Sequence, residues 1–275
     1  MYTITSTKKL HNGIEMPRVG LGVYKMDEPE EAFNAIKKAL DTGYIAVDTA
    51  ALYNNEQQVG EALRSSGKKR EDIFITSKVW NTDQGYDETL RAFEKTLTTL
   101  KTDYLDLYLT HWPVPEKFPD TYRAIERLYD EKLIQATGVS NHEIHHLEKL
   151  FATANIKPMV NQIELHPYLS QVELRHFCKE NNIVVTAWSP LGRGNVLQDE
   201  TIKTIGEKYD KSIAQTIIRW HIQSDHIVIP KSVTPSRIEE NANVFDFELT
   251  NEDMATIDNL NRNERFGSHP DHFKY

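Results

Sequence analysis

IFITSKVWNTDQGYDETLRAFEKTLTTLKTDYLDLYL, residues 73–109, contains two apolar runs separated by a helical pattern. The runs 73–79 and 104–109 have the length and the β-branched and aromatic content of buried strands. Between them, apolar residues recur every three or four positions along 87–100, which is typical of one face of a helix. A strand, a helix and a second strand in this order predict a βαβ unit with parallel strands.

The same alternation continues through most of the chain. The expected strands are 18–22, 44–47, 73–79, 104–109, 134–140, 159–163, 183–188 and 226–230. The expected helices are 29–42, 55–65, 87–100, 119–131, 142–154, 170–182 and 212–224. This pattern predicts an α/β fold whose parallel sheet closes into a (β/α)8 TIM barrel, with a doubly wound sheet as the alternative. No change of composition marks a second domain, so residues 1–275 are expected to form a single domain.

The two ends of the chain differ from this pattern. LHNGI (10–14) predicts an N-terminal β-hairpin, because Asn12-Gly13 tolerates the two positive φ angles of a tight turn. The segment 266–275 is aromatic, rich in histidine and without periodicity. We expect it either to fold over one end of the barrel or to fray.

Composition restricts the classes of function. The chain is 39% apolar and 27% charged, as in ordinary globular proteins, and its net charge of −9 comes without a polybasic run. Binding to nucleic acid or to an anionic membrane is therefore not expected. There is no apolar run of transmembrane length and no signal-peptide core near the start. The single cysteine, Cys178, excludes an intrachain disulfide and favours a buried thiol in a cytoplasmic protein.

Four polar residues follow or end expected strands in the first half of the chain. Asp48, Lys78 and His111 each lie at the end of a strand, and Tyr53 follows Asp48 by five residues. The carboxyl ends of barrel strands open on the same rim, so these side chains are expected to meet there. A phenol beside an ammonium, with a carboxylate and an imidazole nearby, is suited to proton transfer. We expect Lys78 to lower the pKa of Tyr53. The alternatives are a surface tyrosine and a structural ion pair between Asp48 and Lys78.

Six stretches, in this order, resemble the motifs of the aldo-keto reductases. They are GYIAVDTAALYNNEQQVG (43–60), LYLTHWP (107–113), GVSN (138–141), NQIELHP (161–167), AWSPLGRG (187–194) and IPKSVTPSRIEEN (229–241). Within the family the chain is most similar to prokaryotic-type 2,5-diketo-D-gluconate, glyoxal and methylglyoxal reductases, which share a segment like 77–86. The resemblance implies a monomeric enzyme that reduces aldehydes and ketones to alcohols with NADPH. Small dicarbonyls, keto sugars and aromatic aldehydes are all candidate substrates.

The resemblance also implies residue roles. Tyr53 is the general acid, Asp48 and Lys78 tune it, and His111 orients the substrate carbonyl. The implied substrate-binding residues are Tyr24, Tyr53, Trp80, His111 and Trp112. The implied cofactor-binding residues are Gly22, Val23, Tyr24, Asp48, Ser140, Asn141, Gln162, Trp188, Ser189, Leu191, Gly192, Lys231, Ser232, Val233, Arg237, Glu240 and Asn241. No metal ligand is expected among them.

The stretch 229–241 also favours NADPH over NADH on physical grounds. Lys231 follows a strand, Ser232 adds a hydroxyl, and Arg237 lies near an expected helix start. Two cations, a hydroxyl and helix N–H groups suit the 2′-phosphate of NADPH in an otherwise acidic protein. A solvated surface pair is the alternative.

The chain departs from the family pattern at four positions, which are Ile45, Ala46, Thr137 and His142.

Two other classes of function compete with the reductase interpretation. Residues 142–146 fit H-E-x-x-H, the zinc-protease pattern, in which the first and last histidines share a helix face. A cofactor-binding regulatory subunit without turnover is the non-enzymatic alternative. No G-x-G-x-x-G follows an expected strand, which disfavours a Rossmann dehydrogenase.

Overall fold

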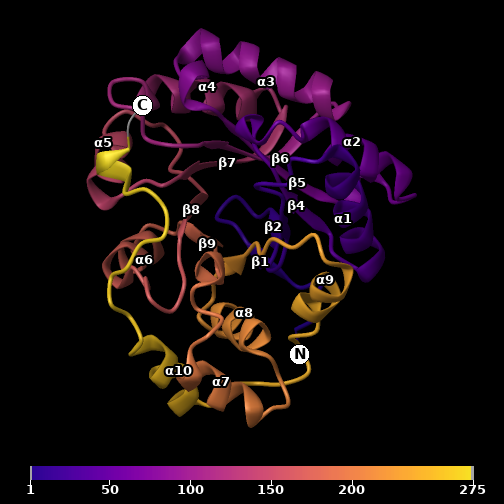
Figure 1. The fold of residues 1–275 in the computed structure, drawn as a ribbon. Helices are drawn as coiled ribbons and strands as arrows, with labels where there is room; N and C mark the ends of the chain where they lie inside the picture. The colour runs from indigo at the N-terminus through magenta and orange to yellow at the C-terminus, as the bar shows by residue number, and fades with distance from the viewer. Residues whose placement is uncertain (1, 274–275) are drawn as a thin grey trace.

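Eight parallel strands form the central sheet of the computed structural model, which describes residues 2–273 (Figure 1). They are β3 Leu21–Gly22, β4 Ala46–Asp48, β5 Phe74–Val79, β6 Leu105–Thr110, β7 Ile134–Ser140, β8 Val160–Glu164, β9 Val184–Trp188 and β10 Ile227–Val228. The strands are hydrogen-bonded in chain order from β3 to β10. The first and last strands are joined as well, because Gly20 N donates to Val228 O and Val228 N to Arg18 O, each over 3.0 Å. The predicted barrel is confirmed, and the strand order does not fit a doubly wound sheet.

Helices surround the strands on the outside (Figure 1). They are α1 Pro29–Thr42, α2 Glu56–Ser65, α3 Tyr86–Leu100, α4 Phe118–Asp130, α5 Ile144–Phe151, α6 Val172–Glu180, α7 Glu200–Glu207, α8 Ile213–Gln223, α9 Pro235–Ala242 and α10 Asn251–Asp258. Each expected helix has a counterpart within a few residues. The helices α7 and α10 were not predicted, and α9 was expected only as a helix start near Arg237. Within the described residues no helix combines the length and apolarity needed to cross a bilayer.

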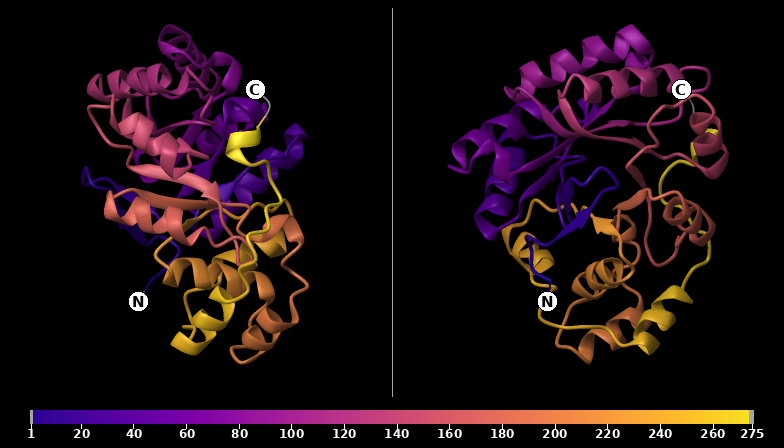
Figure 2. Two further views of the ribbon diagram at one scale, coloured as in Figure 1. Left: turned by 90° about the vertical axis from the view of Figure 1, so that its left-hand side faces the viewer. Right: turned by 180° about the vertical axis from the view of Figure 1, so that it is seen from behind.

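The N-terminal hairpin forms as predicted but with a different turn. Strands β1 Thr7–Lys9 and β2 Glu15–Pro17 pair antiparallel, with Lys8 opposite Met16. Only Gly13 of the turn dipeptide has a positive φ, at 95°, so the expected pair of positive φ angles is wrong. Leu10 and Met16 are buried in one cluster with the first residues of several barrel strands, Ala46 and Phe74 among them. The hairpin therefore closes the N-terminal end of the barrel, as Figure 2 shows from behind.

Side chains alternate along the strands, and this positions the site. In β6, Leu107 and Leu109 point into the barrel, whereas Tyr108 points outward and packs edge-on against Phe93 of α3, with ring centroids 5.0 Å apart. The inward positions become polar at the carboxyl ends of the strands. Cys178 is fully buried as expected, and burial raises the pKa of its thiol to about 12, so the thiol is unreactive.

Candidate active site

A buried ion pair joins two neighbouring strands at the carboxyl end of the barrel. Asp48 ends β4, and Lys78 lies one residue before the end of β5. Lys78 is fully buried, and its Nζ lies 2.5 Å from Oδ1 of Asp48 and 2.9 Å from the carbonyl oxygen of Thr49. The same ammonium donates to the hydroxyl of Tyr53 over 3.3 Å. The structure thus brings three of the four predicted catalytic groups into direct contact.

Tyr53 is held by a short 3-10 turn, η1 (Ala51–Tyr53), in the loop after β4. Asn55 fixes this loop, because its side chain accepts from the Thr49 hydroxyl and donates to the carbonyl of Val23. The ring of Tyr53 lies between Tyr24, at a centroid distance of 5.0 Å, and His111, at 5.8 Å. All four predicted catalytic residues therefore surround one point on the rim.

The charges of this cluster follow from burial and from the ion pair. Burial lowers the pKa of Lys78, but Asp48 and Tyr53 together oppose that effect and the net shift is upward. Burial also raises the pKa of Tyr53; Lys78 opposes this, yet the net shift is upward. Lys78 thus lowers the pKa of Tyr53 as expected, but desolvation exceeds the attraction of the ammonium. Burial and the nearby Lys78 place the pKa of His111 well below its usual value, so its imidazole is neutral at pH 7.

A hydrogen-bond network connects the catalytic cluster to the expected cofactor side. Asn141 donates to the carbonyl oxygen of His111 over 3.0 Å and accepts from Nε1 of Trp188 over 2.8 Å. Gln162 donates to Oδ2 of Asp48 over 2.6 Å, and its backbone carbonyl accepts from the hydroxyl of Ser140 over 2.8 Å. Ser140, Asn141, Gln162 and Trp188 are thus placed together, as the sequence predicted. The bond from Gln162 to the catalytic carboxylate was not predicted.

Aromatic rings form a wall beside the catalytic cluster. Trp80 meets His111 edge-on, with ring centroids 5.1 Å apart, and Trp112, the residue after His111, is buried. Phe273 stacks on Trp112 at 4.3 Å and meets Trp80 edge-on at 6.3 Å. Phe273 lies in the aperiodic tail, where the sequence offered no signal for a contact with this wall.

The tail reaches the wall by crossing the carboxyl ends of β8 and β9. In Figure 1 it runs from α10 past α6 to α5. The buried carboxylate of Glu164 accepts the backbone N–H groups of Phe266 and Gly267, over 2.7 and 3.1 Å. A Cβ atom on Gly267 would lie 2.4 Å from Cη2 of Trp188, so the tail backbone rests directly against the indole. Residues 266–273 of the tail therefore fold over one end of the barrel, which was the first of the two expectations. Residues 274–275 lie outside the described part.

Three of the implied cofactor-binding residues, Ser189, Leu191 and Gly192, follow β9 in a tight turn. Ser189 has a φ of 48° and Gly192 a φ of 55°. A side chain on Gly192 would meet Val196 at 2.4 Å. Leu191 is partly buried against the core. This stretch of backbone therefore leaves β9 through a tight turn beside Trp188.

The predicted 2′-phosphate residues lie at the amino end of α9. Lys231 and Arg237 are exposed, and neither forms an ion pair with any residue in 2–273. No side chain caps α9, while Ser232 accepts the N–H of Thr234 over 3.1 Å. Gly22 lets β3 approach this segment, since a Cβ there would lie 2.7 Å from the carbonyl oxygen of Ile229.

Three predicted cofactor residues remain, and each is packed, buried or hydrogen-bonded within the protein. They are Val233, Glu240 and Asn241. Val233 packs against the core, and Asn241 is buried. The carboxylate of Glu240 accepts from the hydroxyl of Ser212. The structure therefore turns Glu240 toward the start of α8.

The H-E-x-x-H residues do not converge in the way that pattern requires. His142 precedes α5, is buried, and places its Nδ1 2.9 Å from the carbonyl oxygen of Ser140. Burial lowers its pKa to about 3. Glu143 caps α5 and pairs with Arg265 over 2.8 Å. His142 thus lies outside α5, although its ring meets that of His146 edge-on with centroids 5.8 Å apart, and Glu143 is engaged with the tail.

The other departures from the family pattern have local partners as well. The hydroxyl of Thr137 lies 2.9 Å from that of Tyr122. Ala46 lines the barrel beside Phe74, and the carbonyl of Ile45 accepts the N–H of Phe74. None of these residues displaces a catalytic side chain.

The aldo/keto reductase family model matches residues 18–262. The chain belongs to the aldo/keto reductase family. Glyoxal reductase of Bacillus subtilis (strain 168) is 54% identical over 269 residues, which are 98% of each chain. The 9,11-endoperoxide prostaglandin H2 reductase of Trypanosoma cruzi (strain CL Brener) is 51% identical, over 96% of this chain and 94% of its own. The crystal structure of a Gox0644 mutant in complex with NADPH superimposes with a TM-score of 0.94 at 43% identity, covering 98% and 99% of the two chains.

Membership of this family confirms the predicted resemblance and the enzyme class. The matched region contains all four predicted catalytic residues and all the predicted cofactor residues. Its upper limit, residue 262, excludes the tail that carries Phe273 and Asp271. The part of the aromatic wall that the tail supplies therefore lies outside the residues that the family model matches.

Proposed function

We propose that this protein reduces aldehydes and ketones to alcohols with NADPH, and that Tyr53 is the proton donor. The observation that carries the proposal is the contact of the Tyr53 hydroxyl with the buried, Asp48-paired ammonium of Lys78. NADPH, when bound, supplies the hydride. The NADPH complex of the related Gox0644 mutant supports this choice of cofactor.

The residues at the amino end of α9 fit such a cofactor. Lys231 and Arg237 are cationic, exposed and without an ion pair in the described part of the chain. The uncapped first turn of α9 adds free N–H groups beside them. These donors suit a phosphate dianion, which would be the 2′-phosphate of NADPH. Trp188 and its partner Asn141 would hold the nicotinamide end.

The chemistry of the carbonyl oxygen depends on three residues. Tyr53 keeps its proton at neutral pH, because its pKa is raised. Once it gives that proton to the oxygen, the remaining phenolate is stabilised by the Lys78 ammonium. His111 is neutral and offers an N–H to the same oxygen, which stabilises charge that develops there.

The substrate proposal rests on the aromatic wall and on the named relatives. Tyr24, Trp80, Trp112 and Phe273 form an apolar wall beside His111. The relative from Bacillus subtilis is named for glyoxal, whereas the relative from Trypanosoma cruzi is named for a prostaglandin. We therefore propose small reactive dicarbonyls as the first substrate class, with keto sugars and aromatic aldehydes next.

A carbonyl panel followed by NADPH absorbance tests the proposal, with kcat/KM as the ranking. Turnover of at least one dicarbonyl by the wild type, and its loss in Tyr53→Phe, is the expected result. Tight NADPH binding with no turnover of any carbonyl would favour the regulatory subunit instead.

We further propose that residues 1–275 form a single domain and that the protein is a cytoplasmic monomer. The exposed large apolar side chains, Tyr2, Tyr24, Val172 and Leu197, come from separate parts of the chain. The buried single cysteine agrees with a reducing compartment. Light scattering after size-exclusion chromatography measures the molar mass, and a dimer mass would overturn the monomer.

A further inference from the structure

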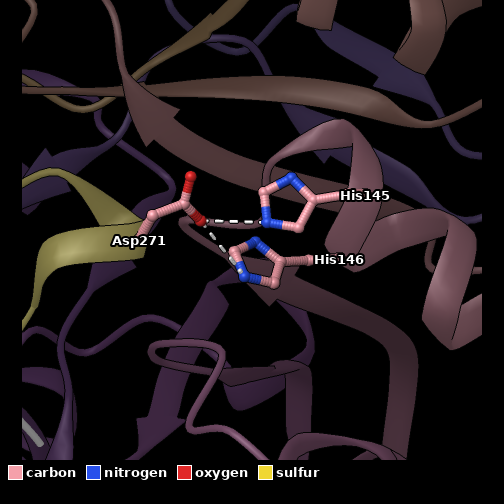
Figure 3. A group of neighbouring side chains, drawn as sticks. All are labelled: His145, His146 and Asp271. Carbon is pink, nitrogen blue, oxygen red and sulfur yellow. Dashed lines mark ion pairs between the residues drawn. The ribbon is translucent and has the colours of Figure 1, made fainter.

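Three potential metal ligands converge at a place outside the proposed catalytic site. His145 and His146 lie in the first turn of α5, and Asp271 lies in the short turn η5 (Pro270–His272) of the tail. Oδ1 of Asp271 is 2.9 Å from Nε2 of His145 and 3.5 Å from Nε2 of His146. Figure 3 shows both imidazoles directed at this one carboxylate oxygen. One ligand atom from each residue lies within 4.8 Å of the others.

These distances approach those of a tetrahedral metal site. Zinc bonds of about 2.0–2.2 Å to nitrogen and oxygen place neighbouring ligand atoms roughly 3.3–3.6 Å apart. The separation of 3.5 Å between His146 and Asp271 falls in this range, whereas the 2.9 Å between His145 and Asp271 is shorter, and the exposed His145 can adjust its rotamer. Two imidazoles and one carboxylate are also a ligand set that zinc uses with water in the fourth position. We propose that His145, His146 and Asp271 bind one divalent transition-metal ion of the zinc class.

Metal binding by this cluster requires His146 to change its ring tautomer and to give up a hydrogen bond. Nδ1 of His146 accepts the N–H of Glu143 over 3.1 Å, as part of the capping box of α5. The neutral ring therefore carries its proton on Nε2, toward Asp271. Metal binding at Nε2 moves this single ring proton to Nδ1, with no net release of a proton from His146, and breaks the cap hydrogen bond. The nearby cation Lys149 is already paired with Glu116, and His269 faces the other oxygen of Asp271.

The site would join the tail to the barrel. Asp271 lies two residues before Phe273, which stacks on Trp112 of the aromatic wall. A metal ion held by α5 and by Asp271 would therefore fix the tail where it contacts that wall. This inference concerns metal binding and does not depend on the proposed reaction.

Calorimetric titration of ZnCl2 into the full-length protein, made without a histidine tag and stripped with chelator, tests the proposal. We expect saturable binding of one equivalent. His146→Gln retains a residue suited to the capping box but removes a ligand, and Asp271→Asn keeps the shape of the side chain. Each should weaken the affinity at least tenfold. His176→Ala is the matched control, because His176 is exposed and contacts one carboxylate, Glu180, at 3.1 Å.

A thermal melt with and without ZnCl2 gives a second readout that needs no activity. Zinc should raise the Tm of the wild type and of His176→Ala, and should not raise that of His146→Gln. The melt without zinc also shows whether each variant is folded. The proposal is overturned by the absence of saturable zinc binding to the wild type. It is equally overturned if His146→Gln and Asp271→Asn, both folded, bind zinc as the wild type does.

Discussion

Gln162 donates a hydrogen bond to Asp48 across the mouth of the barrel, with 2.6 Å between Nε2 and Oδ2. The two residues lie on β8 and β4, which are four strands apart in the sheet. Asp48 therefore has a partner on each oxygen, Lys78 on Oδ1 and Gln162 on Oδ2. The expected cofactor side of the site is thus linked to the carboxylate that holds the catalytic ammonium.

Gln162→Leu tests this link. The variant leaves Oδ2 of Asp48 without its donor, and a hydrogen bond to a charged group contributes about 1.5–3 kcal/mol. We expect kcat to fall by roughly ten- to a hundredfold, together with weaker NADPH binding. If only the KM for NADPH rises while kcat is unchanged, Gln162 serves the cofactor alone.

Tyr53→Phe tests the proton donor. The variant keeps the ring between Tyr24 and His111 but removes the hydroxyl that contacts Lys78. Loss of a general acid lowers kcat by about 10²–10⁴-fold, and NADPH affinity should stay within about twofold of the wild type. Stopped-flow turnover and fluorescence titration measure the two quantities. A rate near that of the wild type would contradict the role of Tyr53.

The double variant Lys231→Ala, Arg237→Ala tests the phosphate site. Each charge-assisted hydrogen bond contributes about 1.5–3 kcal/mol, so the Kd for NADPH should rise by at least a hundredfold. The Kd for NADH should change little, because NADH lacks the 2′-phosphate. Lys203→Ala, an exposed lysine paired with Glu200 on α7, is the control. Equal losses for the two cofactors would refute the assignment.

Gly267→Ala tests the contact between the tail and the indole. The new Cβ would lie 2.4 Å from Cη2 of Trp188, so the ring or the tail has to move. Overpacking of this kind costs about 1–3 kcal/mol, and NADPH binding should weaken severalfold to a hundredfold. Ser268→Ala, at the exposed next position, should bind NADPH as the wild type does. Unchanged affinity in Gly267→Ala would show that Trp188 does not hold the nicotinamide end.

Acid should destabilise the fold through buried histidines. Burial lowers the pKa of His221 to about 3, against about 6.5 in an unfolded chain. Between these values the unfolded state binds a proton that the folded state does not, so stability is full above pH 6.5 and falls as the pH drops toward 3. The loss from this residue is about 1.4 kcal/mol per pH unit, or roughly 2 kcal/mol at pH 5.

Urea unfolding of His221→Gln at pH 7 and at pH 5 measures this contribution. Nε2 of His221 lies 3.5 Å from the carbonyl oxygen of Pro190, a contact that a glutamine amide can replace. The variant should lose less stability between the two pH values than the wild type loses. The exposed His176→Gln variant should lose as much as the wild type. An identical pH dependence in all three proteins would disprove the contribution of His221.

The parts of the site that the sequence predicted depend on short-range geometry. Asp48 and Lys78 lie on neighbouring strands, and the two-residue alternation of a strand turns both side chains inward. The strand positions were likewise readable, because each buried strand is a short apolar run between longer amphipathic segments. The lowering of the Tyr53 pKa by Lys78 was readable from charge, whereas the larger upward effect of burial was not, because a sequence does not reveal how deeply a side chain is buried.

The parts that the sequence missed depend on contacts between distant segments. The bond from Gln162 to Asp48 spans the barrel, and the contact of Phe273 with Trp112 joins the tail to the loop after β6. No periodic pattern marks such a contact. The cluster of His145, His146 and Asp271 was missed for the same reason, as its carboxylate lies 125 positions beyond its nearer histidine.

Glu164 anchors the tail through the backbone N–H groups of Phe266 and Gly267. Every residue except proline carries such a group, so this anchor does not depend on the side chains that follow. Substitutions at Phe273 can therefore reshape the wall beside His111 while the tail remains attached to β8. Mutagenesis for new carbonyl substrates is best begun at Phe273, because this residue contacts the wall through Trp80 and Trp112, whereas Gly267 of the same tail rests against Trp188.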